Sequence, residues 1–255
     1  MLVVERQREI VGLVERERSV RVNLLARRFQ VTEETIRRDL EKLEREGKLV
    51  RSHGGAVFFG HGGRETPIAE RAVHSVQEKT AIARDAVQRI EEGDTILVDA
   101  STTAMQMVRL LPDIELTVLT NSLQVCQELA GRTRMRVICT GGELSVLSLS
   151  FVGPRAEQML ADYHVNRLFF SCTGVDLSYG LSDINEDQAV LKQRMMAAAD
   201  HTYLLADRSK FGIRALKRFG ALEEVKTMIT NDGLNPALLA ALAEREITVV
   251  QAPTL

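Results

Sequence analysis

One charged segment near the N-terminus, VTEETIRRDLEKLEREG (residues 31–47), carries side chains suited to nucleic-acid recognition. Its apolar residues recur at helical spacing, at Ile36, Leu40 and Leu43, and predict a helix with one buried face. Opposite or flanking that face lie Glu34, Thr35, Arg37, Arg38, Glu41 and Arg45. Arginine can bond guanine through two hydrogen bonds, and threonine can contact bases or phosphates. The segment therefore predicts a helix that reads DNA, although charged faces also occur on helices that are merely solvated.

A second set of polar residues follows strand-like segments farther along the chain. These stretches are DASTT (99–103), TNS (120–122), TGG (140–142), TGVD (173–176), ADRSKFG (206–212) and TND (230–232). Ligands of open parallel sheets bind beyond the carboxyl ends of the strands, so these stretches predict a polar binding site. Its candidate residues are Asp99, Ser101, Thr102, Thr103, Thr120, Asn121, Gly141, Gly142, Asp176 and Lys210.

The chemistry of these strand ends favours an anionic ligand with hydroxyl groups. The strand-to-helix turn at residues 101–103 offers hydroxyls and helix N–H groups to an anion such as phosphate. Lys210 would add positive charge, while Asp99, Asn121 and Asp176 would bond sugar hydroxyls. The alternative is that Ser101 or Thr102 merely caps the next helix.

The DNA-reading helix requires a small supporting domain, which we expect over residues 1–57. Its apolar residues mark two further helices, the first at Val3, Ile10, Leu13 and Val14 and the second at Leu24, Leu25 and Phe29. Only QVT separates the second helix from the third, which Thr32 would cap, and this is helix-turn-helix geometry. Gln30 stands where many such turns have glycine, at a cost of about 1 kcal/mol if the backbone is left-handed. KLVRSHGGAVFF then predicts a hairpin, or wing, around His-Gly-Gly.

The polar strand ends require an α/β domain with a mostly parallel sheet. Seven strand-like segments are DTILVDA, LTVLTN, MRVICTGG, RLFFSCTG, TYLLAD, VKTMITND and ITVVQA. Most are separated by helix-like segments, at 102–111, 123–130, 154–163, 186–199 and 236–245. Such alternation indicates βαβ units. We therefore predict a glycine-rich linker over 58–75 and a larger domain over 76–255.

Composition is that of a globular protein and excludes several classes. No run of about 18 apolar residues occurs, so we expect no membrane span. The opening MLVVERQREIV is charged where a signal peptide needs an apolar core, which predicts a cytoplasmic protein. Residues 18–51 contain ten Lys/Arg and six Asp/Glu, a local +4 within a chain of net charge −2, as expected for a region that meets phosphate. The three cysteines, Cys126, Cys139 and Cys172, lie in apolar runs, so we expect them to be buried and inert.

The N-terminal segment LLARRFQVTEETIRRDLEKLEREGKLVRSHGGA resembles the winged helix-turn-helix of the DeoR family of bacterial transcriptional regulators. TIRRDL and RSHGGA carry the resemblance. It implies that Thr35, Arg37 and Arg38 contact bases or phosphates, with Arg51 and His53 assisting from the wing. The full set of candidate DNA contacts is Thr32, Glu34, Thr35, Arg37, Arg38, Arg51, His53 and Gly54.

The rest of the chain resembles the effector domain of the same family, through EKTAIARDAVQRIEEGDTILVDASTTAM, LTVLTNSLQVCQELA, SLSFVGPRAEQ and LLADRSKFG. That domain is similar in fold to ribose-5-phosphate isomerase, glucosamine-6-phosphate deaminase and coenzyme A transferases, and DASTT stands at their phosphate loop. The resemblance implies a repressor of carbohydrate catabolism, released from operator DNA by a phosphorylated sugar or related metabolite.

Two other classes of function compete with a regulator. A sugar-phosphate isomerase or deaminase would need a carboxylate base, for which Asp99, Asp176 and Glu186 are candidates. It would not need a recognition helix, and the isomerases' KGRGG-type segment is absent from the sequence. A DNA-architectural protein would leave the polar strand ends unexplained. We therefore expect a homo-oligomeric regulator, dimer or tetramer, that binds double-stranded DNA and an effector and needs neither metal nor cofactor.

Overall fold

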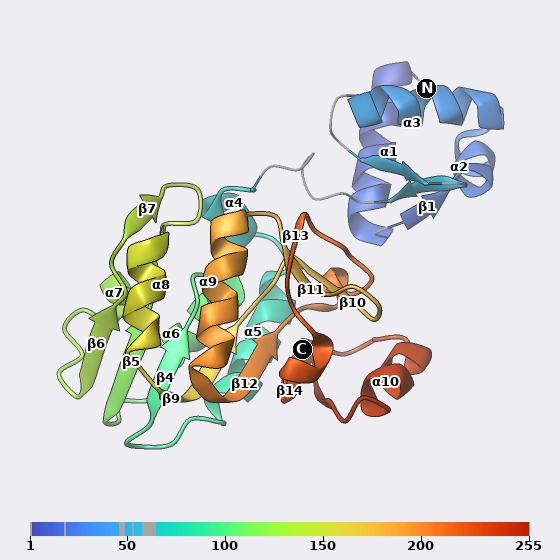
Figure 1. The fold of residues 1–255 in the computed structure, drawn as a ribbon. Coiled ribbons are helices and arrows are strands. Elements are labelled where there is room, and N and C mark those ends of the chain that lie inside the picture. The colour runs from blue at the N-terminus through green and yellow to red at the C-terminus, as the bar shows by residue number, and fades with distance from the viewer. Residues whose placement is uncertain (1, 18, 46–48, 53, 58–64, 255) are drawn as a thin grey trace. The chain divides into compact units, whose positions relative to one another are not determined.

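The computed structural model describes residues 2–17, 19–45, 49–52, 54–57 and 65–254. Contacts divide the chain into two compact units, Met1–Thr66 and Pro67–Leu255 (Figure 1). No helix in the described ranges combines the length and apolar character needed to cross a membrane.

The N-terminal unit consists of three helices and a small antiparallel sheet. Its elements are α1 (Val3–Glu17), β1 (Ser19–Arg21), α2 (Val22–Phe29), α3 (Glu33–Arg45), β2 (Val50–Ser52) and β3 (Gly55–Val57). The sheet has the order β1-β3-β2. The predicted helices and wing hairpin are confirmed, and β1 is an addition that pairs with β3 on the side away from β2.

The core of this unit follows the predicted apolar faces with two exceptions. Its buried members include Ile10, Leu13, Val14, Leu25, Ile36, Leu40 and Leu43. Val3 and Leu24, which helped to mark the first two helices, lie outside this core, with exposed fractions of 50% and 56%. Near the start of α1 the chain instead buries Arg6 and Gln7, whose polar groups both bond Asp39 of α3.

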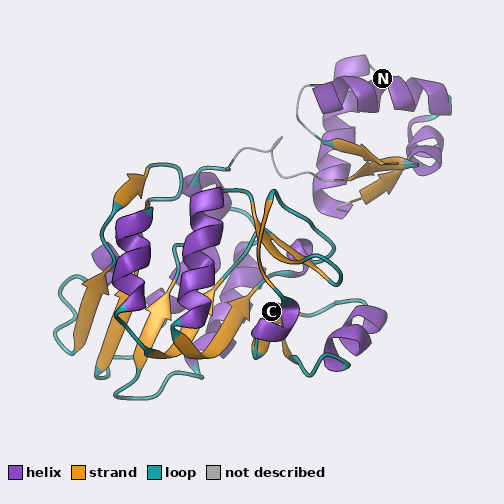
Figure 2. Cartoon of the chain, viewed as in Figure 1, coloured by secondary structure: helices purple, strands orange, loops and turns teal. Residues whose placement is uncertain are grey.

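The C-terminal unit is built on a seven-stranded parallel sheet (Figure 2). Its strands, in spatial order, are β15 (Thr248–Ala252), β14 (Thr227–Asn231), β12 (Ala199–Leu205), β9 (Val165–Phe170), β4 (Thr95–Val98), β5 (Leu116–Thr120) and β6 (Met135–Cys139). These are the seven predicted strands, and their parallel pairing confirms the expected α/β fold.

Helices cover both faces of this sheet, so its strands are apolar on both sides. The helices are α4 (Ile68–Ala72), α5 (Val76–Val87), α6 (Thr102–Arg109), α7 (Leu123–Leu129), α8 (Pro154–Ala161), α9 (Glu186–Ala197) and α10 (Pro236–Ala243). Along β9, Leu168 and Phe170 belong to the core shared with α8 and α9, whereas Phe169 belongs to the core shared with α5, α6 and α7.

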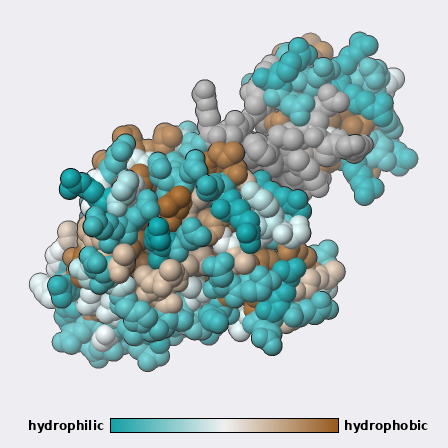
Figure 3. All heavy atoms as spheres, in the orientation of Figure 1, coloured by the Kyte–Doolittle hydropathy of each residue, from teal (hydrophilic) through white to brown (hydrophobic). Residues whose placement is uncertain are grey.

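Short antiparallel elements and 3-10 turns complete the unit. They are β7 (Glu143–Ser145), β8 (Ser150–Val152), β10 (Gly174–Asp176), β11 (Gly180–Asp183), β13 (Lys217–Gly220), η2 (Arg208–Lys210) and η3 (Leu222–Glu224). They form a β7-β8 hairpin and a β10-β11-β13 sheet, neither of which the sequence predicted. Outward-facing residues are mostly hydrophilic on the face seen in Figure 3, with apolar side chains scattered among them.

The order of strands changes direction once, between β4 and β9. After β4 the chain adds β5 and β6 on one side, and then returns to place β9 against the other edge of β4. From β9 it continues outward through β12, β14 and β15. The carboxyl ends of β4 and β9 therefore flank the topological switch point, where open α/β sheets bind their ligands.

Part of the range predicted as linker is helical. Residues 58–64 lie outside the described residues, but α4 occupies 68–72 within the range predicted as linker. Ile68 is buried, and its N–H donates to the carbonyl of Leu147 at 2.7 Å. Lys79 Nζ donates to the carbonyls of Arg71 and His74, which fastens the end of this segment to α5.

Candidate nucleic-acid interface and effector site

The turn between α2 and α3 has the tight geometry that a helix-turn-helix requires. Gln30 adopts a left-handed conformation, with φ 53° and ψ 43°, which a non-glycine residue rarely does. The N–H of Val31 donates to the carbonyl of Ala26 at 3.1 Å. Thr32 Oγ1 then accepts the N–H of Thr35 at 3.2 Å, so Thr32 caps α3 as predicted.

The exposed face of α3 presents two arginines, each paired with a glutamate one turn earlier. Arg37 bonds Glu33 at 2.9 Å, and Arg38 lies 3.4 Å from Glu34. The side chain of Arg38 is 79% exposed and that of Glu34 63%. Exposed pairs of this kind contribute little to stability, so either arginine can exchange its carboxylate for a phosphate or base at small cost.

A buried polar cluster fixes α3 against α1. Arg6 Nε lies 2.6 Å from Asp39 Oδ2, and Gln7 Nε2 donates to Asp39 Oδ1 at 2.8 Å. These side chains are almost fully buried, so removing Asp39 would leave a buried guanidinium without a partner. This cluster was not predicted, because Asp39 follows two exposed arginines in the sequence and resembles another surface charge.

The wing depends on one glycine more than on the other. A Cβ at Gly55 would lie 1.8 Å from the carbonyl oxygen of Val20, so only glycine lets β3 approach β1. Gly54 faces open space, and its carbonyl accepts the N–H of Val22 at 2.8 Å. Arg51 lies within β2, and the candidate His53 falls outside the described residues.

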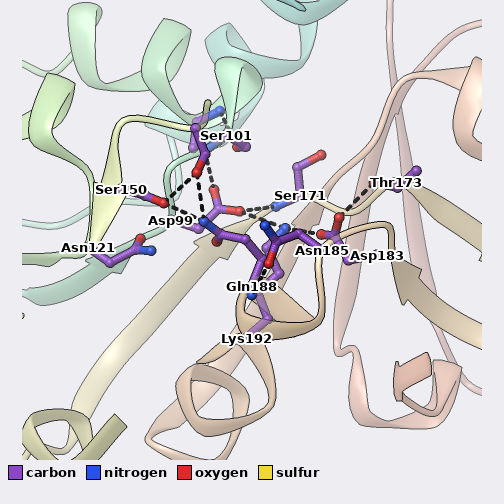
Figure 4. A network of polar contacts seen from close by, with 12 residues as sticks. Asp99, Ser101, Asn121, Ser150, Ser171, Thr173, Asp183, Asn185, Gln188 and Lys192 are labelled. Atoms are coloured by element: carbon purple, nitrogen blue, oxygen red, sulfur yellow. Dashed lines mark hydrogen bonds and ion pairs between the residues drawn. The ribbon is translucent and has the colours of Figure 1, made fainter. Parts of the chain in front are cut away.

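Asp99 organises the backbone at the topological switch point. One carboxylate oxygen accepts the N–H of Ser101 at 3.1 Å, and the other accepts the N–H of Ser171 at 3.0 Å. The second oxygen also lies 3.5 Å from Lys192 Nζ (Figure 4). Asp99 is 1% exposed, so these contacts make it a positioning residue that joins the ends of β4 and β9.

The turn after Asp99 places the N-terminus of α6 beside the carboxyl end of β4. Ser101 Oγ accepts the N–H of Ala104 at 3.1 Å, so the capping alternative applies to Ser101. Thr102 and Thr103 form the first turn of α6 and are nearly buried. The first N–H groups of a helix have no partner within it, and they carry the positive end of the helix dipole.

The end of β5 contributes one latch and one unsatisfied acceptor. Thr120 Oγ1 donates to the carbonyl of Val98 at 2.8 Å and accepts the N–H of Ser122 at 3.0 Å, which ties β5 to β4. Asn121 Nδ2 donates to the carbonyl of Phe151, and this bond fixes which amide atom is oxygen. Asn121 Oδ1 is buried and has no hydrogen-bond partner among the described residues. A buried acceptor without a donor is uncommon in folded proteins and needs an explanation.

An ion cluster that the sequence did not predict lies beside Asp99. Lys192 Nζ lies 2.6 Å from Asp183 Oδ2, and Thr173 Oγ1 donates to Asp183 Oδ1 at 2.8 Å. Burial lowers the pKa of Lys192, but the carboxylates of Asp183 and Asp99 outweigh it and raise the pKa above its ordinary value. Burial also raises the pKa of Asp183, yet the ammonium of Lys192 and the hydrogen bonds hold it below its ordinary value.

Helix α9, which carries Lys192, has a second buried polar side chain one turn earlier, that of Gln188. Gln188 Nε2 donates to Ser148 Oγ at 3.1 Å and to Ser150 Oγ. Gln188 and Lys192 are four residues apart in α9, where Ala189, Leu191 and Met195 are also buried. Two polar residues four apart among apolar ones were the sequence pattern that could have indicated this buried cluster.

A third polar turn lies at the end of β12. Asp207 Oδ1 accepts the N–H of Ser209 and begins the 3-10 turn that carries partly exposed Lys210. Burial raises the pKa of Asp207, but Lys210 and hydrogen bonding to Ser209 hold it below its ordinary value. Burial, assisted by Lys210, lowers the pKa of the neighbouring Lys79 to about 8. The turn therefore carries one lysine and one carboxylate, and Lys79 of α5 adds a second positive charge nearby.

Three predicted site residues have evident structural roles elsewhere. Gly142 has φ +111°, and a Cβ there would lie 2.6 Å from the carbonyl of Val152, so it allows the loop after β6 to approach β8. Gly141 also has positive φ. Asp176 is the last residue of β10, in the small antiparallel sheet, and pairs with Arg214 at 3.1 Å. Burial raises the pKa of Asp176, but Arg214 and the turn N–H groups lower it to about 2.

Comparison with known proteins matches both units. A family model described as "DeoR-like helix-turn-helix domain" matches residues 6–61, and one described as "DeoR C terminal sensor domain" matches residues 74–232. The uncharacterized HTH-type transcriptional regulator YulB of Bacillus subtilis is 50% identical over 253 residues, which is 99% of this chain and 98% of that protein. The L-fucose operon activator of Escherichia coli K12 is 36% identical over 229 residues, 89% of this chain and 94% of that protein. Transcriptional repressor AccR of Agrobacterium fabrum is 35% identical over 234 residues, 90% of each chain.

Proposed function

Since the chain belongs to the DeoR family of transcriptional regulators, we propose that it represses a carbohydrate-catabolism operon and leaves its operator when a phosphorylated sugar binds. The chain is a DNA-binding regulator with a sensor domain, and the isomerase or deaminase alternative is set aside because the family consists of regulators. Relatives named as an operon activator and as a repressor both occur, so the direction of control belongs to the proposal.

The topological switch point supports an effector site between the ends of β4 and β9. The N-terminus of α6 follows Asp99 closely in the chain. The carboxylate of Asp99 holds the ends of β4 and β9 together. The end of β5, the other neighbour of β4, adds the unpartnered Asn121 Oδ1. A cluster of polar groups around a single switch point is the observation that carries the proposal.

The chemistry of these groups favours a phosphate at one end of the ligand and hydroxyls at the other. Helix N–H groups and the hydroxyls of Thr102 and Thr103 would hold the phosphate, with Lys210 adding charge from the end of β12. Asn121 Oδ1 would accept a hydrogen bond from a sugar hydroxyl, which would satisfy it.

The DNA side of the proposal uses two copies of the N-terminal unit. In each copy α3 would enter the major groove with Thr35, Arg37 and Arg38, and the wing would contact the backbone. Two copies would bind half-sites about one helical turn apart. The effector would favour a different arrangement of the subunits, and full release requires a preference of about 5.5 kcal/mol for one state.

Thr102→Val combined with Lys210→Ala should give a regulator that binds operator DNA normally but responds poorly to its effector. The exchanges remove one hydroxyl and one charge from the proposed phosphate site. Since hydrogen bonds to charged groups contribute about 1.5–3 kcal/mol, the effector concentration for half-release should rise at least tenfold. DNA release in fluorescence anisotropy measures this concentration.

Thr80→Val with Lys226→Ala is the matched control. Thr80 Oγ1 bonds the carbonyl of Val76 within α5, and Lys226 is exposed before β14. This pair of exchanges should leave the effector response unchanged. A normal response from the Thr102 and Lys210 variant would place the effector elsewhere.

A further inference from the structure

Two of the three cysteines lie together at one edge of the parallel sheet. Cys139 is the last residue of β6, the edge strand beside β5 (Figure 1). Its register partner is Thr120, the last residue of β5. The next helix, α7, begins three residues later, and Cys126 N donates to Ser122 O in its first turn. The fold therefore brings Cys126 back over the end of β6.

Cys139 lies on the same face of β6 as Met135 and Val137, because side chains alternate along a strand. Met135 and Val137 pack in one core cluster with Val125 and Leu129 of α7, so Cys139 and Cys126 belong to elements that pack against each other. Cys139 is exposed and Cys126 half-buried, whereas Cys172 is buried. The expectation that all three thiols are buried was therefore wrong for two of them. For Cys139 it failed because an apolar run on an edge strand keeps one side open to solvent, and the sequence does not show which strand lies at the edge.

We propose that Cys126 and Cys139 form a redox-responsive dithiol that a peroxide converts to an intramolecular disulfide. The thiolate of Cys139, which is open to solvent, attacks one peroxide oxygen and becomes a sulfenic acid, releasing hydroxide that takes up a proton to give water. The thiol of Cys126 then attacks that sulfur and loses its proton, and the sulfenic oxygen leaves as a second water. Each sulfur loses one electron and the peroxide gains two.

The local chemistry supports this order of events. The hydrogen bond from Cys126 lowers the pKa of Cys139 to about 6, and the same contact and burial raise the pKa of Cys126. Cys139 is therefore the attacking sulfur and Cys126 the resolving one. Burial raises the pKa of Cys172 to about 12, which makes it an internal reference in the same molecule. The disulfide would tie α7 to the loop that carries Gly141 and Gly142.

The test treats the reduced, full-length protein with hydrogen peroxide, blocks remaining thiols with N-ethylmaleimide and identifies tryptic peptides by mass spectrometry without reduction. The expected product joins peptide 110–132 to peptide 137–155, with a mass two hydrogens below their sum, and dithiothreitol reverses it. Peptide 168–192, which contains Cys172, should not be oxidised. In untreated protein, Cys139 should be alkylated at least about tenfold faster than Cys172 at pH 7.

Cys126→Ala provides the second reading. In this variant the sulfenic acid on Cys139 should persist and react with dimedone, because no resolving thiol is present. Three results in the wild-type protein would overturn the proposal: no oxidation of Cys139, oxidation to sulfinic acid without the cross-link, or a disulfide between two chains.

Discussion

Lys192→Met should lower the free energy of unfolding of the C-terminal unit by about 3–5 kcal/mol, because it leaves two buried carboxylates without their cation. Lys192 Nζ lies 2.6 Å from Asp183 and 3.5 Å from Asp99, and all three side chains are at most 10% exposed. Methionine retains most of the aliphatic stem, so the change removes mainly the charge.

Tyrosine fluorescence during urea unfolding measures this loss of stability in the C-terminal unit. The chain has no tryptophan, and its three tyrosines, Tyr163, Tyr179 and Tyr203, all lie in the C-terminal unit. Lys217→Met is the matched control, since Lys217 and Glu186 form an exposed pair at 2.8 Å that should contribute nothing measurable. Equal urea midpoints for the two variants would mean that Lys192 does not stabilise the two buried carboxylates.

The measurement belongs at neutral pH, as the signs of the two shifts show. The lowered pKa of Asp183 contributes stability that is present above the unfolded carboxyl pKa and is lost as the pH falls through the folded value. The raised pKa of Lys192 contributes stability that is present below the unfolded lysine pKa and is lost as the pH rises through the folded value. Both contributions are complete between those limits, and wild-type protein should lose its advantage over the variant on acidification.

Arg38→Ala should weaken operator binding by about 1–3 kcal/mol for each subunit's contact, tenfold or more in the affinity of the assembly. The Arg38 side chain is 79% exposed and pairs with exposed Glu34, so its removal should leave the fold intact. Fluorescence anisotropy with labelled operator DNA measures the affinity, and circular dichroism checks the helix.

Arg89→Ala is the control with the same local geometry. Arg89 pairs with Asp85 one turn earlier at 3.0 Å, but it lies on the C-terminal unit. Its removal should not change operator affinity. If Arg38→Ala binds operator as well as the control does, the charged face of α3 is only a solvated surface.

Much of the fold followed from local patterns in the sequence. Seven apolar runs gave the seven parallel strands, because both faces of such a sheet are covered and the strands need no alternation. The turn at Gln30 and the cap at Thr32 were readable because each depends on neighbouring residues alone. Short pairings such as β10 with β11 were not predicted, since their residues gain partners only when distant segments meet.

The candidate site was only partly predictable for the same reason. The polar stretches after the strands predicted a site at the carboxyl ends of the strands, and the structure brings Asp99, Ser101 and Asn121 there. Lys192 and Asp183 escaped notice because a buried ion pair is defined by two segments that the sequence presents as separate surface charges. Only the structure shows that Asp99 already holds the backbone, which shifts the proposed ligand contacts toward α6 and Asn121.

The most direct test of ligand-controlled DNA binding is fluorescence anisotropy with DNA from upstream of the protein's own and neighbouring genes, titrated with salt and with phosphorylated sugars and polyols. We expect log affinity to fall linearly with log salt, with a slope that reflects several phosphate contacts, and we expect one phosphorylated compound to release the DNA. Affinity that does not depend on salt, or binding that no compound in the panel alters, would contradict the proposed regulator.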